Sequence, residues 1–84
     1  MKSIKLSMYN SSMGILIDVR DKQSYNNFHY NGSKNIPYDE LIFNHKKYLN
    51  KYDTYFIICQ NGYLSKKAVN ILTVYGYNAI NVTR

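Results

Sequence analysis

The run from Thr54 to Ile58 constrains the fold most, because it is apolar at consecutive positions rather than at every second one. A strand that is apolar on both faces is typical of the centre of a parallel sheet covered by helices on both sides. A stretch with helical spacing, from Ser65 to about Tyr75, follows it and ends at Gly76, and a further apolar run covers residues 79–82. Strands that alternate with helices predict a parallel α/β sheet with right-handed crossovers.

The first half of the chain has the same alternation in shorter elements. A buried strand, a helix, a short strand and a second helix are predicted over residues 15–20, 22–28, 33–36 and 40–49. Asp21 and Asp39 precede the two helices and are suited to cap them. Residues 3–12 fit either a strand or a helix, and we favour a brief strand followed by one helical turn.

Two of the predicted helices have an inner face of apolar residues at helical spacing. These faces consist of Leu41, Ile42, Tyr48 and Leu49 in the first, and of Ala68, Val69, Ile71, Leu72 and Tyr75 in the second. His45 lies among lysines, and we expect it to face solvent.

Length and charge limit the classes of function. Eighty-four residues suffice for one small domain, 1–84, and not for two cores. The net charge of +6 favours anionic ligands, but the eleven Lys and Arg residues are scattered, with only the pairs Lys46-Lys47 and Lys66-Lys67. We therefore expect no nucleic acid partner. No apolar run approaches the roughly 20 residues that span a bilayer, and residues 1–7 lack the uninterrupted apolar segment of a signal peptide. We therefore expect a cytoplasmic protein without membrane contact.

Cys59 is the only cysteine, and it stands between the predicted central strand and a predicted helix. One cysteine excludes an internal disulfide, and with only His29 and His45 beside it we expect neither a metal site nor another cofactor. Gly62 permits a tight turn, backbone N–H groups can surround the sulfur, and Ser65 can cap the helix that follows. These features predict a reactive thiolate. On spacing alone, a small core side chain at the end of an apolar strand is an equally good interpretation.

Five segments, in order, resemble the successive signatures of single-domain rhodaneses: 15–20, 25–29, 31–37, 59–65 and 75–77. The resemblance implies that Cys59 accepts a sulfane sulfur from a donor such as thiosulfate and passes it, as a persulfide, to cyanide, a thiol or an acceptor protein. It implies an active-site loop that binds the substrate, in which the amides of residues 60–64 hold the sulfur. The residues of this loop are Gln60, Asn61, Gly62, Tyr63, Leu64 and Ser65. It assigns Asp18 and Arg20 a supporting role around the loop, for which we favour a structural ion pair.

Three departures from the family pattern qualify the resemblance. Gln60 and Leu64 stand where active thiosulfate sulfurtransferases often carry Arg or Lys, which predicts weaker binding of a divalent anion. Lys66 and Lys67 can compensate from the next helix, although a solvated face is the simpler interpretation. The segment before residue 15 is short for the family. The chain also reaches Arg84 where the family continues into a last helix, so we expect that helix to be missing or truncated.

Other functions of the cysteine loop remain open at this point. Related phosphatases and arsenate reductases need an arginine in the loop, and this loop contains none. His29 matches a family histidine and is interpreted as structural rather than as a base for Cys59. A non-catalytic rhodanese-fold binding module and a redox sensor based on Cys59 are the alternatives to a sulfurtransferase.

Overall fold

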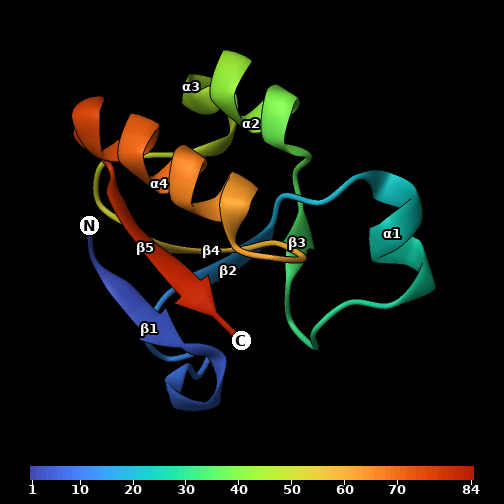
Figure 1. Cartoon of the computed structure of the whole chain (residues 1–84). Helices are drawn as coiled ribbons and strands as arrows, with labels where there is room; N and C mark the ends of the chain where they lie inside the picture. The colour runs from blue at the N-terminus through green and yellow to red at the C-terminus, as the bar shows by residue number, and fades with distance from the viewer.

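Five parallel strands form a single sheet in the order β1-β5-β4-β2-β3 in the computed structural model, which describes residues 1–84 (Figure 1). The strands are β1 (Ser3–Lys5), β2 (Ile15–Asp18), β3 (Lys34–Asn35), β4 (Thr54–Ile58) and β5 (Asn78–Thr83). The helices are the 3₁₀ helix η1 (Leu6–Met8) and α1 (Lys22–Asn27), α2 (Tyr38–Phe43), α3 (His45–Tyr48) and α4 (Tyr63–Val74). None of them combines the length and the apolar character needed to cross a membrane. The predicted parallel α/β fold is confirmed.

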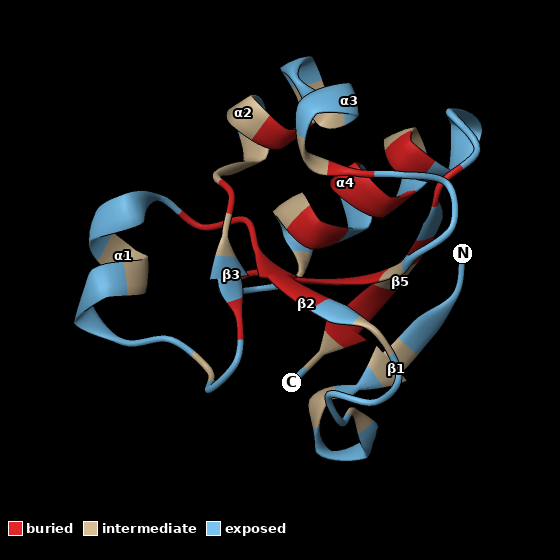
Figure 2. Ribbon diagram, turned by 180° about the vertical axis from the view of Figure 1, so that it is seen from behind, coloured by how far each residue is buried: buried red, intermediate tan, exposed pale blue.

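Strand β4 is central, with hydrogen bonds to β2 on one side and to β5 on the other. Its side chains alternate between two apolar clusters, so both of its faces are buried (Figure 2). Tyr55 and Ile57 belong to the larger cluster, which packs against α2, α3 and α4, whereas Phe56 and Ile58 belong to the smaller cluster on the other face. The consecutive apolar positions of this run therefore reflect a strand that is covered on both sides.

The second face of the sheet is covered by short segments rather than by a long helix. Leu6 of η1, Tyr9 and Tyr30 pack against the smaller cluster, and the Tyr9 and Phe56 rings lie 5.0 Å apart. Helix α1 lies beside the β3 edge of the sheet (Figure 1) and contributes no buried residue. The core on this face is correspondingly small, with four buried residues against 13 on the other face.

Gly14 allows the chain to enter β2 close to its neighbour. A Cβ at this position would lie 2.5 Å from the Thr54 carbonyl oxygen and 2.9 Å from the Phe56 ring. The Gly14 carbonyl also accepts a hydrogen bond of 2.7 Å from the Tyr9 hydroxyl. Only glycine fits here, because one of the two obstructions is the backbone of β4.

Most predicted boundaries agree with the structure, but the helix expected over residues 40–49 is wrong. It is divided into α2 and α3 at Asn44, whose backbone leaves the helical conformation. Asn is a weak helix former, because its side chain can compete for backbone hydrogen bonds. The Asn44 side chain donates to the Glu40 carboxylate at 3.2 Å. Asp39 does not cap α2, because Pro37 occupies the N-cap position and Asp39 lies within the first turn. Asp21 does cap α1, as predicted, by accepting a bond of 2.8 Å from the Ser24 N–H.

The last helix also differs from its prediction at both ends. Helix α4 begins at Tyr63, two residues before the predicted cap Ser65, and its N-cap is Gly62. Tyr75 is not an inner residue: it is 53% exposed, and its ring packs on His45 with 4.4 Å between centroids. The expectation that His45 faces solvent is therefore wrong. Its ring packs on Tyr75, and its Nδ1 lies 2.7 Å from the Tyr77 hydroxyl.

Candidate active site

Cys59 follows the last residue of β4, at the carboxyl edge of the parallel sheet. This edge is where open α/β sheets place their ligands. The side chain is 4% exposed and belongs to the larger core cluster. Strand β4 thus fixes the position of the sulfur, while the loop that follows determines what surrounds it.

The loop turns sharply into α4. Gly62 has a φ of +85°, which a residue with a side chain adopts only with strain. The Asn61 side chain accepts a hydrogen bond of 3.0 Å from the Tyr63 N–H and so closes the turn. Helix α4 therefore starts close to the sulfur, with Tyr63 as its first residue.

One backbone N–H group donates to the sulfur, and it belongs to Ser65. The N···Sγ distance is 3.2 Å. Ser65 is the third residue of α4, so this N–H is one of the groups that have no partner within the helix. The predicted set of amides from residues 60–64 does not contact Sγ, because the helix begins earlier than expected and brings the amide of Ser65 there instead.

The Ser65 hydroxyl links the sulfur to the next strand. Its Oγ accepts a hydrogen bond from the Cys59 thiol at 3.3 Å and lies 2.6 Å from Asn81 Oδ1 on β5. The Gly62 carbonyl oxygen, at 3.2 Å, is a second acceptor for this hydroxyl. Sequence reasoning missed Asn81, although a polar residue within the apolar run 79–82 was a signal that this position has a polar partner.

Asp18 and Arg20 form a buried ion pair with an N–O distance of 2.7 Å. The hydrogen bonds that the Arg20 guanidinium donates to the Asp18 carboxylate raise the pKa of Arg20 above its ordinary value, because they stabilise the charged guanidinium. Arg20 also donates to the Phe28 carbonyl, and the Asn35 side chain bonds to the carbonyl oxygens of both Asp18 and Arg20 at 3.0 Å. The pair therefore joins β2 to β3 and to the end of α1, which agrees with the structural role favoured from the sequence.

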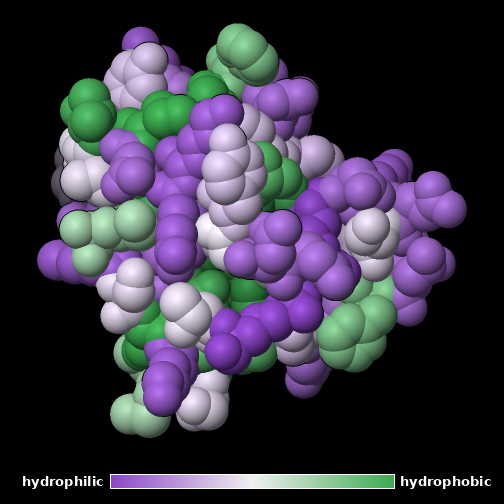
Figure 3. Space-filling model, in the orientation of Figure 1, coloured by the Kyte–Doolittle hydropathy of each residue, from purple (hydrophilic) through white to green (hydrophobic).

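Two hollows open beside Cys59. One, of about 340 Å³, is lined by Arg20, Asp21, Ser24, Cys59, Gln60, Asn61, Tyr63 and Leu64. The other, of about 270 Å³, is lined by Cys59, Gln60, Asn61, Gly62, Lys66, Val82, Thr83 and Arg84. Figure 3 shows strongly hydrophilic surface where the end of β5 emerges near the start of α4. Lys66 and Arg84 thus bring positive charge to the second hollow, although the loop itself contains no cation.

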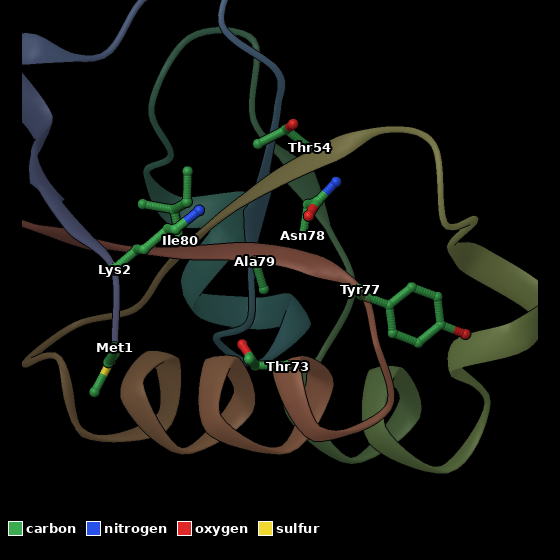
Figure 4. Close-up of a pocket in the computed structure, with 8 residues that line it drawn as sticks. All are labelled: Met1, Lys2, Thr54, Thr73, Tyr77, Asn78, Ala79 and Ile80. Atoms are coloured by element: carbon green, nitrogen blue, oxygen red, sulfur yellow. The ribbon is translucent and has the colours of Figure 1, made fainter.

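A larger hollow, of about 590 Å³, lies at the opposite edge of the sheet (Figure 4). Thr54, the first residue of β4, and Asn78, the first residue of β5, belong to its lining. The full lining is Met1, Lys2, Thr54, Thr73, Tyr77, Asn78, Ala79 and Ile80. It includes no cysteine, histidine or carboxylate, so its size does not make it a stronger candidate than the hollows at Cys59.

His29 belongs to neither hollow beside the sulfur. Its ring stacks on Tyr25 with 3.9 Å between centroids, and its Nδ1 lies 2.9 Å from the Tyr25 carbonyl oxygen. These contacts fit the structural role that we favoured for His29. No cluster of three or more His, Cys, Asp or Glu side chains is arranged to hold a metal ion.

The sequence model of the rhodanese-like domain family matches residues 4–83 of this chain. The chain belongs to the rhodanese-like domain family. Among solved structures, a protein from Staphylococcus saprophyticus is 31% identical, with a TM-score of 0.86 over 98% of this chain and 86% of its own. A rhodanese-like domain protein from Staphylococcus aureus is also 31% identical, with a TM-score of 0.85 over 98% of this chain and 84% of its own.

A human single-domain sulfurtransferase shares the same fold. Its TM-score is 0.80 over 98% of this chain and 88% of its own, at 23% identity. No curated protein matches the chain.

Proposed function

We propose that this rhodanese-like domain is a sulfurtransferase that carries a sulfane sulfur as a persulfide on Cys59. The observation that carries the proposal is the position of the sulfur: at the end of β4, bonded by an N–H from the first turn of α4, with two hollows beside it. A helix N-terminus stabilises a negative charge, and the thiolate is the nucleophilic form of cysteine.

The reaction balances without an external oxidant. The Cys59 thiolate attacks the outer sulfur of thiosulfate, an S–S bond forms, and the bond to the inner sulfur breaks with release of sulfite. An acceptor thiolate or cyanide then attacks the outer sulfur of the persulfide, and the Cys59 thiolate leaves. Sulfane sulfur is therefore transferred unchanged in oxidation state.

The loop amides are available for the outer sulfur. The N–H groups of Gln60, Asn61 and Gly62 make no hydrogen bond within the protein. In the proposed persulfide state the terminal sulfur carries the negative charge and extends beyond Sγ, where these donors can reach it. We therefore assign Ser65 to the thiolate and residues 60–62 to the persulfide.

Lys66 and Arg84 are proposed to attract an anionic sulfur donor. Both line the smaller hollow together with Cys59. Arg20 lines the other hollow, but its charge is paired with Asp18. Because Lys66 and Arg84 are exposed, salt screens their attraction for an anion. The site therefore has no strong preference for a divalent anion, and a small persulfide is as suitable a donor as thiosulfate.

The experiment is to incubate the protein with thiosulfate, or with a low-molecular-weight persulfide, and to measure its intact mass. We expect a gain of one sulfur atom, which a reductant removes. The variant Cys59→Ser should show no gain with either donor. Absence of a gain in the wild-type protein with both donors would refute the proposal.

A non-catalytic binding module is the second candidate, favoured by the burial of Cys59 and by the absence of a cation in its loop. It predicts that a co-purifying protein partner is retained by Cys59→Ser. A redox sensor predicts instead that peroxide oxidises Cys59 under conditions in which sulfur donors leave its mass unchanged.

A further inference from the structure

We propose that Asn81 is a positioning residue that acts on Cys59 through the Ser65 hydroxyl. Asn81 lies on β5, is fully buried, and has its Oδ1 2.6 Å from Ser65 Oγ. Its Nδ2 is the one buried side-chain nitrogen or oxygen atom of the chain without a hydrogen-bond partner. Buried polar groups are normally satisfied, so an amide with only one end in use needs an explanation.

The donors and acceptors available at Ser65 explain why only one end of the Asn81 amide forms a hydrogen bond. A serine hydroxyl has one proton to donate and can also accept. With Cys59 as a thiol, the thiol proton goes to Ser65 Oγ and the hydroxyl proton goes to Asn81 Oδ1. When Cys59 loses its proton to solvent, the sulfur can only accept, and the hydroxyl proton turns from Asn81 to the negatively charged sulfur, 3.3 Å away.

The amide of Asn81 serves both arrangements. Half a turn of this amide exchanges Oδ1 and Nδ2, which are nearly equal in size. Nδ2 then donates to Ser65 Oγ, while Oδ1 takes the position that has no partner in the thiol form. The thiolate consequently receives two donors from Ser65, its N–H at 3.2 Å and its O–H at 3.3 Å, while Asn81 keeps the hydroxyl pointed at the sulfur.

An apolar residue in place of Asn81 would affect the two forms unequally. In the thiol form, the Gly62 carbonyl at 3.2 Å can replace Asn81 as the acceptor of the hydroxyl proton. In the thiolate form nothing replaces the donor Nδ2. Asn81 therefore favours the thiolate, by about one hydrogen bond, which corresponds to a factor of about two to ten in the fraction ionised.

The other titratable and charged groups around the thiol stay the same in this comparison. Arg20 and Asp21 face it from the segment after β2, Tyr63 and Lys66 from α4, and Arg84 from the end of β5. None of them is hydrogen-bonded to Sγ, which bonds only to Ser65. Their long-range influence is common to the wild-type protein and the Asn81 variants.

The test is the pH dependence of Cys59 alkylation by iodoacetamide. We expect Asn81→Leu to lower the rate about two- to tenfold at neutral pH and to leave the limiting rate at high pH unchanged, with thermal unfolding as the control for folding. Asn81→Val should give the same shift, and it takes the place of Asn81→Leu if the leucine variant does not fold. An unshifted profile in the variant that folds would overturn the proposal.

A second background separates positioning through Ser65 from a general structural effect. In Ser65→Ala the hydroxyl is gone, so adding the Asn81 substitution should change the profile no further. An equal shift in both backgrounds would overturn the proposal. Consequences of Asn81 for sulfur transfer rest on the function proposed above, but alkylation needs no sulfur donor. The two proposals can therefore fail separately.

Discussion

Replacement of Asp18 by Asn tests how far the buried ion pair beside the site stabilises the domain. Asp18 is fully buried and accepts four hydrogen bonds from Arg20, one from its backbone N–H and three from its guanidinium, at 2.7 to 3.1 Å. Asp18→Asn keeps the shape of the side chain but removes the counter-ion of Arg20. The Arg20 side chain is only 9% exposed, so its charge would be left largely buried and unpaired. Removing one partner of a buried pair costs about 3–5 kcal/mol. We expect about 3 kcal/mol, because Arg20 retains its bond to the Phe28 carbonyl.

The assay is urea unfolding at neutral pH, followed by circular dichroism. Domains of this kind have about 5–15 kcal/mol of stability in total, so the midpoint should fall by a large fraction. Asp39→Asn is the matched control, since Asp39 is exposed and its side chain makes no hydrogen bond; it should cost less than about 1 kcal/mol. Equal losses in the two variants would refute the reasoning.

A double variant tests whether the unpaired charge of Arg20 causes this loss of stability. The double variant Asp18→Leu with Arg20→Met removes both charges and should recover much of the stability. A double variant as unstable as Asp18→Asn would show that geometry, rather than an unpaired charge, is responsible.

Three further predictions concern the strand entry, the sulfur donor and the first helix cap. Gly14→Ala should lower the free energy of unfolding by about 1–3 kcal/mol, because a Cβ there overlaps the backbone of β4; an unchanged urea midpoint would contradict this. Lys66→Gln and Arg84→Gln should each slow sulfur loading from thiosulfate about two- to fivefold at low salt and not at high salt, whereas Lys46→Gln on α3 should have no effect. The first turn of α1 bonds to the Asp21 carboxylate and lowers its pKa, so this cap stabilises the protein above the unfolded-state pKa and is lost as the pH falls through the folded-state value. Asp21→Ala should therefore lower the urea midpoint at neutral pH, with a difference that disappears in acid; a constant difference would contradict the assignment.

Local patterns were sufficient to predict the fold and the place of Cys59 in it. The double-sided apolarity of residues 54–58 is a property of consecutive positions, so it located β4 and, directly after it, Cys59. The Asp21 cap is equally local, since its acceptor and the donor N–H lie three residues apart. Patterns that involve only neighbouring residues can be recognised in the sequence without knowledge of the tertiary contacts.

Features that depend on tertiary contacts could not be predicted in the same way. Asn81 and Ser65 lie 16 positions apart and meet because β5 pairs with β4 and α4 crosses between them. His45 and Tyr77 lie 32 positions apart, so the lysines next to His45 were a misleading guide to its surroundings. The start of α4 was misplaced because Gly62, in its left-handed conformation, begins the helix without a side-chain cap.

The most direct test of the account is to load the protein with thiosulfate that is isotopically labelled only in its outer sulfur, and to measure the mass of the peptide that contains Cys59. We expect one labelled sulfur on that peptide, an equal amount of sulfite in solution, and labelled thiocyanate after addition of cyanide. A Cys59 peptide that stays unmodified with both thiosulfate and a low-molecular-weight persulfide, or that carries the unlabelled inner sulfur of thiosulfate, would contradict the proposed persulfide chemistry.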